Sequence, residues 1–329
     1  TDAVRAYGTA RGCDAVMIVS VHTHTGPAIK YHEGCGACCP AYVAHLRESL
    51  CAAAEDAFMD RAEVTSISYG RSDVDGDWIY NRANPDGPVD RCVRGFVLSR
   101  RDHRPLALMG VACHGVFLGR VSSVSADFSG EIIRNLGDMD VVYLNGLCGD
   151  IDPYKPNEEH MVHYGAVVAE TFRTALRSIP MTLSCRTLPF ELHLMPVSRD
   201  TITATADLAV RKAGGEEVGA ARVARAWQKE MLEQFDSLQT REPGEAVSFT
   251  LGGVPIIALP FEGFTAIGQR IREGLESCDA LVLGCADELR GYLPTRDDFE
   301  RGAYAALEST FLYRRLPALP GEAERLAEQ

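Results

Sequence analysis

The sequence AVMIVSVHTHTGP, residues 15–27, places two histidines two positions apart directly after an apolar run. The run at 15–19 predicts a buried strand, because it is short and apolar and a Gly-Pro turn signal follows it. Alternate side chains of a strand point to one face, so His22 and His24 are expected to face the same way at its end. Such a pair can bind a metal, or it can merely cap the strand, because two ligands do not complete a zinc site.

Strand-like and helix-like segments alternate outward from this stretch along most of the chain. This pattern predicts an α/β fold in which helices cover a layered mixed sheet and a metal site lies at strand ends. Strands are expected at residues 64–69, 95–99, 105–113, 141–145, 246–251, 254–259 and 280–284, and helices at 41–59, 161–176, 265–275 and 297–313.

A helical connection is expected at 201–235, a stretch rich in Ala, Leu, Arg and Glu that is interrupted at Gly214-Gly215. We therefore expect residues 1–329 to form a single domain with two lobes, 1–200 and 240–329, joined by the helical segment 201–240.

The composition is that of an ordinary globular protein, with 46% hydrophobic and 24% charged residues in 329. No apolar run is long enough to cross a bilayer and no signal peptide is visible, so a soluble, cytoplasmic protein is expected. The formal net charge of −13 and the lack of clustered Lys and Arg argue against a nucleic-acid partner. The sequence is compatible with a homo-oligomer and does not define the oligomeric state.

Eleven cysteines, several in strand-like and helix-like segments, indicate free thiols in a reducing compartment. The Gly-rich loop at 30–40 differs, because it brings together His32, Cys35, Cys38 and Cys39. A second metal site or a redox pair is one interpretation of this loop, and a loop with incidental thiols is the other.

Two further polar residues follow strand-like segments. His114 ends the run Val111-Ala112-Cys113, and Glu262 lies where a strand meets a helix. Each has an ordinary explanation, since a single histidine is often a packed core residue and an acid can stabilise a helix start. Together with His22, however, they form the two-histidine, one-carboxylate set of a catalytic zinc with an open position.

A zinc ion held in this way would lower the pKa of its water toward ~7 and so provide a nucleophile at neutral pH. His24 is the expected proton carrier, because the pKa of a free histidine, about 6.5, is close to working pH. Asp127 or Asp150 could orient a histidine, although both could equally be capping or turn residues.

These motifs together resemble the neutral, non-lysosomal ceramidase family. The matching segments keep the family's order and approximate spacing from residue 22 to about 304, and they lie at 22–27, 81–82, 113–115, 125–130, 145–153, 262 and 292–295. The resemblance implies a zinc-dependent amidohydrolase that cleaves an N-acyl amide, with ceramide, a sphingolipid, as the family's typical substrate.

The resemblance also implies roles for individual residues. His22, His114, Glu262 and Tyr292 match the family's zinc ligands, whereas His24, Arg82 and Tyr304 match the residues that face the substrate carbonyl and the oxyanion. The assignments of Arg82 and Tyr292 rest on the resemblance alone.

Departures from the family leave the substrate open. The family's strand-rich segment before the H-T-H motif and its C-terminal β-sandwich domain are expected to be missing. Gly146 and Leu147 stand where larger ceramidases have Ser-Asn, so no serine nucleophile is expected there. The alternatives are a hydrolase of a smaller soluble amide or ester, and a catalytically inert metal-binding protein.

Overall fold

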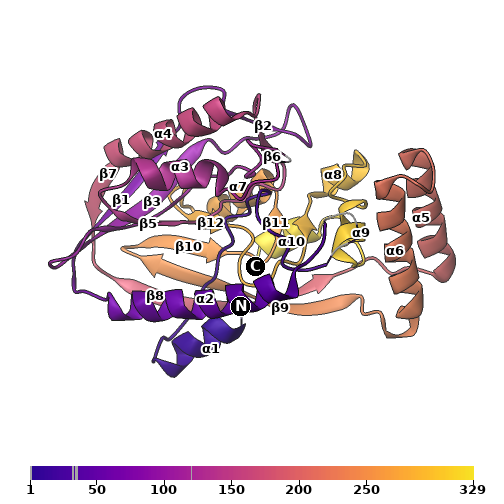
Figure 1. Ribbon diagram of the computed structural model, residues 1–329, viewed down its shortest axis with the longest axis horizontal. Coiled ribbons are helices and arrows are strands. Elements are labelled where there is room, and N and C mark those ends of the chain that lie inside the picture. Colours follow the sequence, from indigo (N-terminus) through magenta and orange to yellow (C-terminus); the bar gives the residue numbers. More distant parts are fainter. Residues whose placement is uncertain (1, 32, 34–35, 120) are drawn as a thin grey trace.

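Two mixed β-sheets stacked face to face form the centre of the protein, with helices on both outer sides (Figure 1). The structure is a computed structural model that describes residues 2–31, 33, 36–119 and 121–329. The first sheet has the strand order β5-β4-β3-β1-β7. Its strands are β1 (Val64–Asp73), β3 (Cys92–Arg100), β4 (Leu106–Gly110), β5 (Asp140–Tyr143) and β7 (Leu176–Ile179). Only β4 and β5 are parallel to each other within it.

Strand β3 shows why this sheet has an apolar core on each side. Val93 and Val97 pack against the helices that cover the sheet, whereas Phe96 enters the core between the two sheets. Successive side chains of a strand point to opposite faces, so a strand buried on both sides must be apolar throughout. The covering helices are α3 (Asp127–Asn135) and α4 (Glu158–Thr174), which pack against each other.

The second sheet has the strand order β12-β10-β9-β8. Its strands are β8 (Leu183–His193), β9 (Arg241–Leu251), β10 (Val254–Ala258) and β12 (Leu281–Leu283), of which only β10 and β12 are parallel to each other. Ile256 packs between the sheets, and its neighbour Ile257 faces the outer core that includes α7 (Thr265–Gly274). The predicted layered α/β fold is therefore confirmed.

The predicted helical connection is a hairpin of α5 (Arg199–Ala213) and α6 (Gly219–Glu233), followed by the short 3-10 helix η1 (Phe235–Ser237). Gly214 ends α5 with φ 90°, a conformation that favours glycine. The hairpin stands at one end of the molecule (Figure 1). Strand β8, from the first predicted lobe, pairs along its whole length with β9 of the second. The division into two lobes stays a prediction.

Residues 15–19 do not form the buried strand that the sequence predicts. The segment is half-buried and makes only one isolated bridge, between Val19 and Ala286. The opposing backbone explains this, because Cys285 (φ 52°) and Asp287 (φ 53°) are left-handed and cannot continue a ladder. Before and after this segment lie α1 (Asp2–Ala10) and α2 (Pro40–Met59), which contact each other.

The single helix predicted at 297–313 is also wrong. Two short helices, α8 (Arg296–Glu300) and α9 (Ser309–Tyr313), are separated by turns. Gly302 adopts φ 66° just after α8, and the turns that follow bring Ala305 and Ala306 into the interior. The last helix is α10 (Glu322–Ala327). Within the described ranges, none of the helices combines the length and apolarity needed to cross a bilayer.

Candidate metal centre

The candidate site lies where the two sheets meet, beyond the carboxyl ends of their parallel strand pairs β4/β5 and β10/β12. The connections after these strands are hydrogen-bonded to one another. Gly284 N–H donates to the Asn145 carbonyl across 3.0 Å, and Cys285 N–H donates to the Phe261 carbonyl across 3.0 Å. Loops at strand ends can place side chains from distant parts of the chain on a rigid base. Each sheet therefore contributes to the site.

The H-T-H motif forms a tight turn beside His114. His22 is left-handed (φ 58°), Thr23 bridges to Gly115, and His24 N–H donates to the Gly115 carbonyl across 3.0 Å. The two imidazoles converge as predicted, with 3.5 Å between their Nε2 atoms. The reason is this turn rather than the alternation of a strand.

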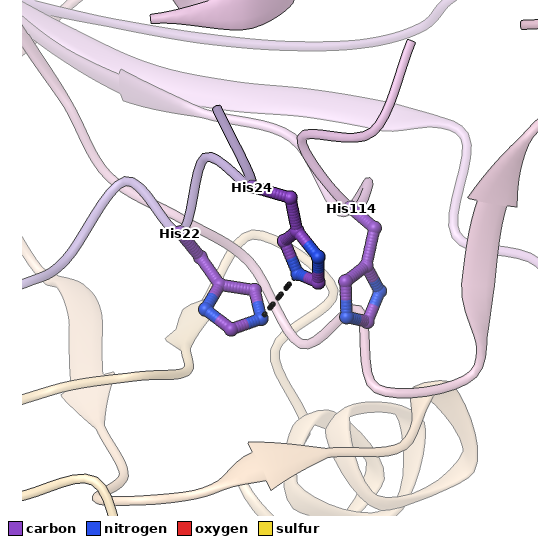
Figure 2. A group of neighbouring side chains, drawn as sticks. All are labelled: His22, His24 and His114. Atoms are coloured by element: carbon purple, nitrogen blue, oxygen red, sulfur yellow. Dashed lines mark hydrogen bonds between the residues drawn. The ribbon is translucent and has the colours of Figure 1, made fainter. Parts of the chain in front are cut away.

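Three histidines form a cluster that could hold a metal ion. One ring nitrogen from each of His22, His24 and His114 lies within 4.8 Å of the others (Figure 2). His114 is fully buried, and its Nδ1 lies 3.1 Å from the Ile151 carbonyl. A carbonyl can only accept, so Nδ1 carries the hydrogen and Nε2 of the neutral ring keeps a lone pair for a metal.

Glu262 completes this cluster from β11 (Glu262–Gly263). Its Oε2 lies 3.0 Å from Nε2 of His22 and 3.2 Å from Nε2 of His114, and its Oε1 accepts a hydrogen bond from Tyr313. Burial acts to raise the pKa of Glu262, but the two histidines outweigh burial and hold the pKa well below its usual range. A buried carboxylate in contact with two imidazoles of a three-histidine cluster fits the ligand chemistry of a divalent transition metal.

The surroundings of His24 favour the neutral imidazole. Loss of hydration, followed by the neighbouring His22 and His114, lowers the pKa of His24 to about 4. His24 is nonetheless the most exposed of the three histidines, so it faces the open side of the cluster.

Arg82 and Tyr292 lie together at the edge of the site. Tyr292 belongs to β13 (Tyr292–Leu293) and faces Glu262 across the parallel pair β11/β13. Arg82 donates to the Tyr292 hydroxyl and to the Gly149 carbonyl, each across 2.9 Å, and to Asp152 across 3.2 Å. Burial and then the charge of Glu262 raise the pKa of Tyr292, so its phenol is protonated.

Tyr304 lies on the exposed side of the residues that the sequence assigns to the site. Its ring meets the Tyr292 ring edge-on at a centroid distance of 6.2 Å, and the side chain is 47% exposed. The structure thus brings all seven predicted site residues into one region. Their individual roles stay predictions.

The two aspartates predicted as partners of a histidine have other contacts. Asp127 accepts hydrogen bonds from the backbone amides of Leu118 and Phe128. Asp150 accepts from Asn81 across 2.7 Å and from the amide and hydroxyl of Thr265 across 2.8 and 2.9 Å. Burial raises the pKa of Asp150 to about 6.

Sequence reasoning missed two residues of the site. Asp152, on β6 (Ile151–Pro153), places Oδ1 3.8 Å from Nδ1 of His114 and bonds Arg82. Tyr313, which bonds Glu262, ends α9. Asp152 lies within the segment 145–153 that resembles the ceramidase family, so the sequence carries a signal for this residue. Tyr313 lies outside every motif.

Asp152 lines a groove of about 470 Å³. Asp152 pairs with Tyr80 of β2 (Ile79–Asn81), and the rings of Tyr80 and Tyr154 meet edge-on at 6.3 Å. Pro85 and Val116 also line the groove. Its walls are therefore largely aromatic and aliphatic.

The cysteine-rich loop remains unassigned. Cys38 is half-buried and Cys39 is exposed, and both are free thiols. Cys35 and His32 lie outside the described residues. A second metal site or redox pair here stays a prediction.

Comparison with known proteins identifies the fold. No family model and no curated protein matches the chain. Solved structures do match, among them neutral ceramidase from Pseudomonas aeruginosa, at 14% identity and a TM-score of 0.68, and a ceramidase complexed with C2, at 13% identity and a TM-score of 0.69. Each match covers 99% of this chain, but only 62% and 63% of the solved chains. The chain thus has the fold of neutral ceramidase and spans less than two thirds of the length of these structures.

Proposed function

We propose that this protein is a zinc-dependent amidohydrolase that cleaves an N-acyl amide. The observation that carries the proposal is the convergence of His22, His114 and Glu262, with Arg82 beside them. The fold shared with neutral ceramidase supports it.

The donor set favours zinc. Two or three imidazole nitrogens and one carboxylate oxygen are the ligands of catalytic zinc sites, and Tyr292 would be the additional oxygen donor. When bound, the ion supplies an activated water and polarises a carbonyl oxygen. The carbonyl of Ile151 fixes the orientation of His114, as expected for a metal ligand.

The remaining residues act on the amide itself. Arg82 presents a permanent positive charge, held in place by Asp152 and the Gly149 carbonyl, toward the position where negative charge develops on the substrate oxygen. The Tyr304 hydroxyl is the second donor. His24 is neutral at pH 7, so its lone pair is free to take a proton from the attacking water and pass it to the leaving amine; with a pKa of about 4 it is a weaker base than the free histidine on which the sequence expectation rested.

The groove beside Asp152 indicates the kind of substrate. Tyr80 and Tyr154, which are 43% and 45% exposed, offer aromatic surface to an apolar group attached to the amide. This favours a lipid or other apolar N-acyl amide, such as the ceramide after which ceramidases are named. A smaller soluble amide or ester is the alternative.

The test is a metal analysis followed by a substrate screen. We expect about one zinc per chain after reconstitution and release of fatty acid from N-acyl amides, with chelation abolishing the release. Release from ceramide would identify a lipid substrate, whereas turnover of short soluble amides or esters alone would favour the alternative. Zinc-loaded protein that hydrolyses none of these would contradict the enzyme proposal.

A further inference from the structure

The two oxygens of the Glu262 carboxylate have different partners. Oε2 faces His22 and His114 at 3.0 and 3.2 Å, whereas Oε1 accepts the hydrogen bond of Tyr313. Glu262 is only 2% exposed, so water does not compete freely for either oxygen. Tyr313 thus engages the oxygen that does not face the histidines, and Tyr292 also hydrogen-bonds this carboxylate.

Contacts on several sides hold Tyr313 in this position. Its ring meets the Tyr292 ring edge-on at 6.3 Å. On another side lies Gly291 (φ 95°), where an added Cβ would come within 3.0 Å of the Tyr313 ring. The next residue, Arg314, bonds Glu230 of α6 across 2.6 Å. The phenol is thus fixed by packing as well as by its hydrogen bond.

We propose that Tyr313 is a positioning residue that makes Glu262 a one-oxygen ligand of the metal. This inference rests on the metal site of the proposed function. A carboxylate can give one or both oxygens to a divalent ion, and a hydrogen bond to Oε1 leaves Oε2 for the ion. A one-oxygen ligand keeps a coordination position open for water or substrate.

The test compares the metal sites of wild type and Tyr313→Phe. The exchange removes the hydroxyl and keeps the ring that packs against Gly291. We expect zinc affinity, measured by competition with a chelator, to fall about 10- to 100-fold. With Co²⁺ in place of zinc, the visible absorption of the variant should weaken, because a freed Oε1 can join the ion and raise its coordination number.

Tyr7→Phe is the matched control. Tyr7 of α1 also donates to a carboxylate, that of Glu55 on α2, but outside the site. The zinc affinity and cobalt spectrum of the Tyr7→Phe variant should equal those of wild type. Gly291→Ala is a second variant that keeps the hydroxyl: its Cβ would crowd the Tyr313 ring, and the φ of 95° also strains the backbone whose carbonyl accepts from the Glu262 amide. It should weaken zinc binding in the same direction even if Tyr313→Phe folds poorly.

The outcomes separate this inference from the proposed function. Unchanged zinc affinity and an unchanged cobalt spectrum in Tyr313→Phe and Gly291→Ala would overturn the role of Tyr313, whether or not the wild type is a hydrolase. Altered metal binding in a protein without hydrolase activity would support Tyr313 and reject the enzyme. A wild type that binds no metal would overturn both.

Discussion

Glu262 and Tyr292 lie directly opposite each other in the parallel pair of β11 and β13. Glu262 follows β10 and Tyr292 follows β12. Because β10 and β12 are parallel neighbours in the second sheet, the segments that follow them also lie side by side in the site. Arg82, which bonds the Tyr292 hydroxyl, is thereby held next to the carboxylate. Two of the groups that are proposed to bind the metal thus share one backbone ladder, and Arg82, proposed for the substrate oxygen, bonds one of them.

The first prediction concerns the metal. His22→Ala and His114→Ala should each lose most bound zinc, because each removes an imidazole that lies within about 3 Å of Glu262. Zinc content is measured by elemental analysis after gel filtration. His103→Ala is the control, since His103 lies in the turn between β3 and β4. Full zinc content in both site variants would reject these ligands.

The second prediction concerns Arg82. Arg82→Ala should keep its zinc but lose turnover by roughly 100- to 1,000-fold, because removing one oxyanion donor costs about 2.7–4 kcal/mol. The measurement is kcat/KM on the amide found in the screen, together with zinc content. Arg91→Ala, which removes an exposed arginine paired with Asp77, should behave as wild type. Equal loss in both variants would indicate a general charge effect.

The third prediction is a pH dependence of stability in metal-free protein. The pKa of Asp150 is about 6 in the folded state, compared with 3.8 in the unfolded chain. The unfolded state therefore loses this proton first as pH rises. Asp150 therefore favours folding most below pH 4, and this contribution is lost between about pH 4 and pH 6. The difference amounts to about 3 kcal/mol.

Asp150→Asn removes this titration. Urea unfolding of both proteins from pH 4 to pH 7 should show that the stability of wild type relative to the variant falls as pH rises. The Asn side chain keeps an oxygen that can accept from Thr265 but places an NH2 group against the Asn81 NH2, and the loss of this one hydrogen bond shifts the variant by an amount that does not depend on pH. A constant difference across this range would show that the pKa of Asp150 is not raised.

The fourth prediction tests how β4 is joined to the site. A Cβ at Gly110 would lie 1.9 Å from the carbonyl oxygen of Leu144, a backbone atom that cannot move aside easily. Gly110→Ala should destabilise the protein by about 3 kcal/mol, measured by urea unfolding. Gly274→Ala is the control, because nothing lies within 4 Å of its added Cβ. It should be neutral or slightly stabilising.

Short motifs were sufficient to predict much of the site. His114 and Glu262 follow strands that the apolar pattern identifies, and strands in layered α/β folds end at a common edge. Most predicted strands and helices are present, including the break at Gly214. These features depend on local pattern, which the sequence displays directly.

The errors arise where a partner segment decides the structure. The apolar run at 15–19 resembles a strand, but the left-handed residues Cys285 and Asp287 opposite it prevent a ladder. Tyr313 lies in a stretch that predicts one long helix, and only the turn after Gly302 brings its hydroxyl to Glu262. The first effect leaves no trace in the local sequence, whereas Gly302 is a helix-breaking residue within the stretch 297–313 that the helical pattern outweighed.

The candidate metal centre draws its residues from loops that follow strands of both sheets, so its geometry depends on how the two sheets pack against each other. His114 belongs to one sheet's connections and Glu262 to the other's, so a slip of one layer past the other would change the distance between them. Phe96 is buried between the two sheets and is not among the proposed ligands. Phe96→Leu should therefore lower metal affinity at temperatures at which the protein is still folded.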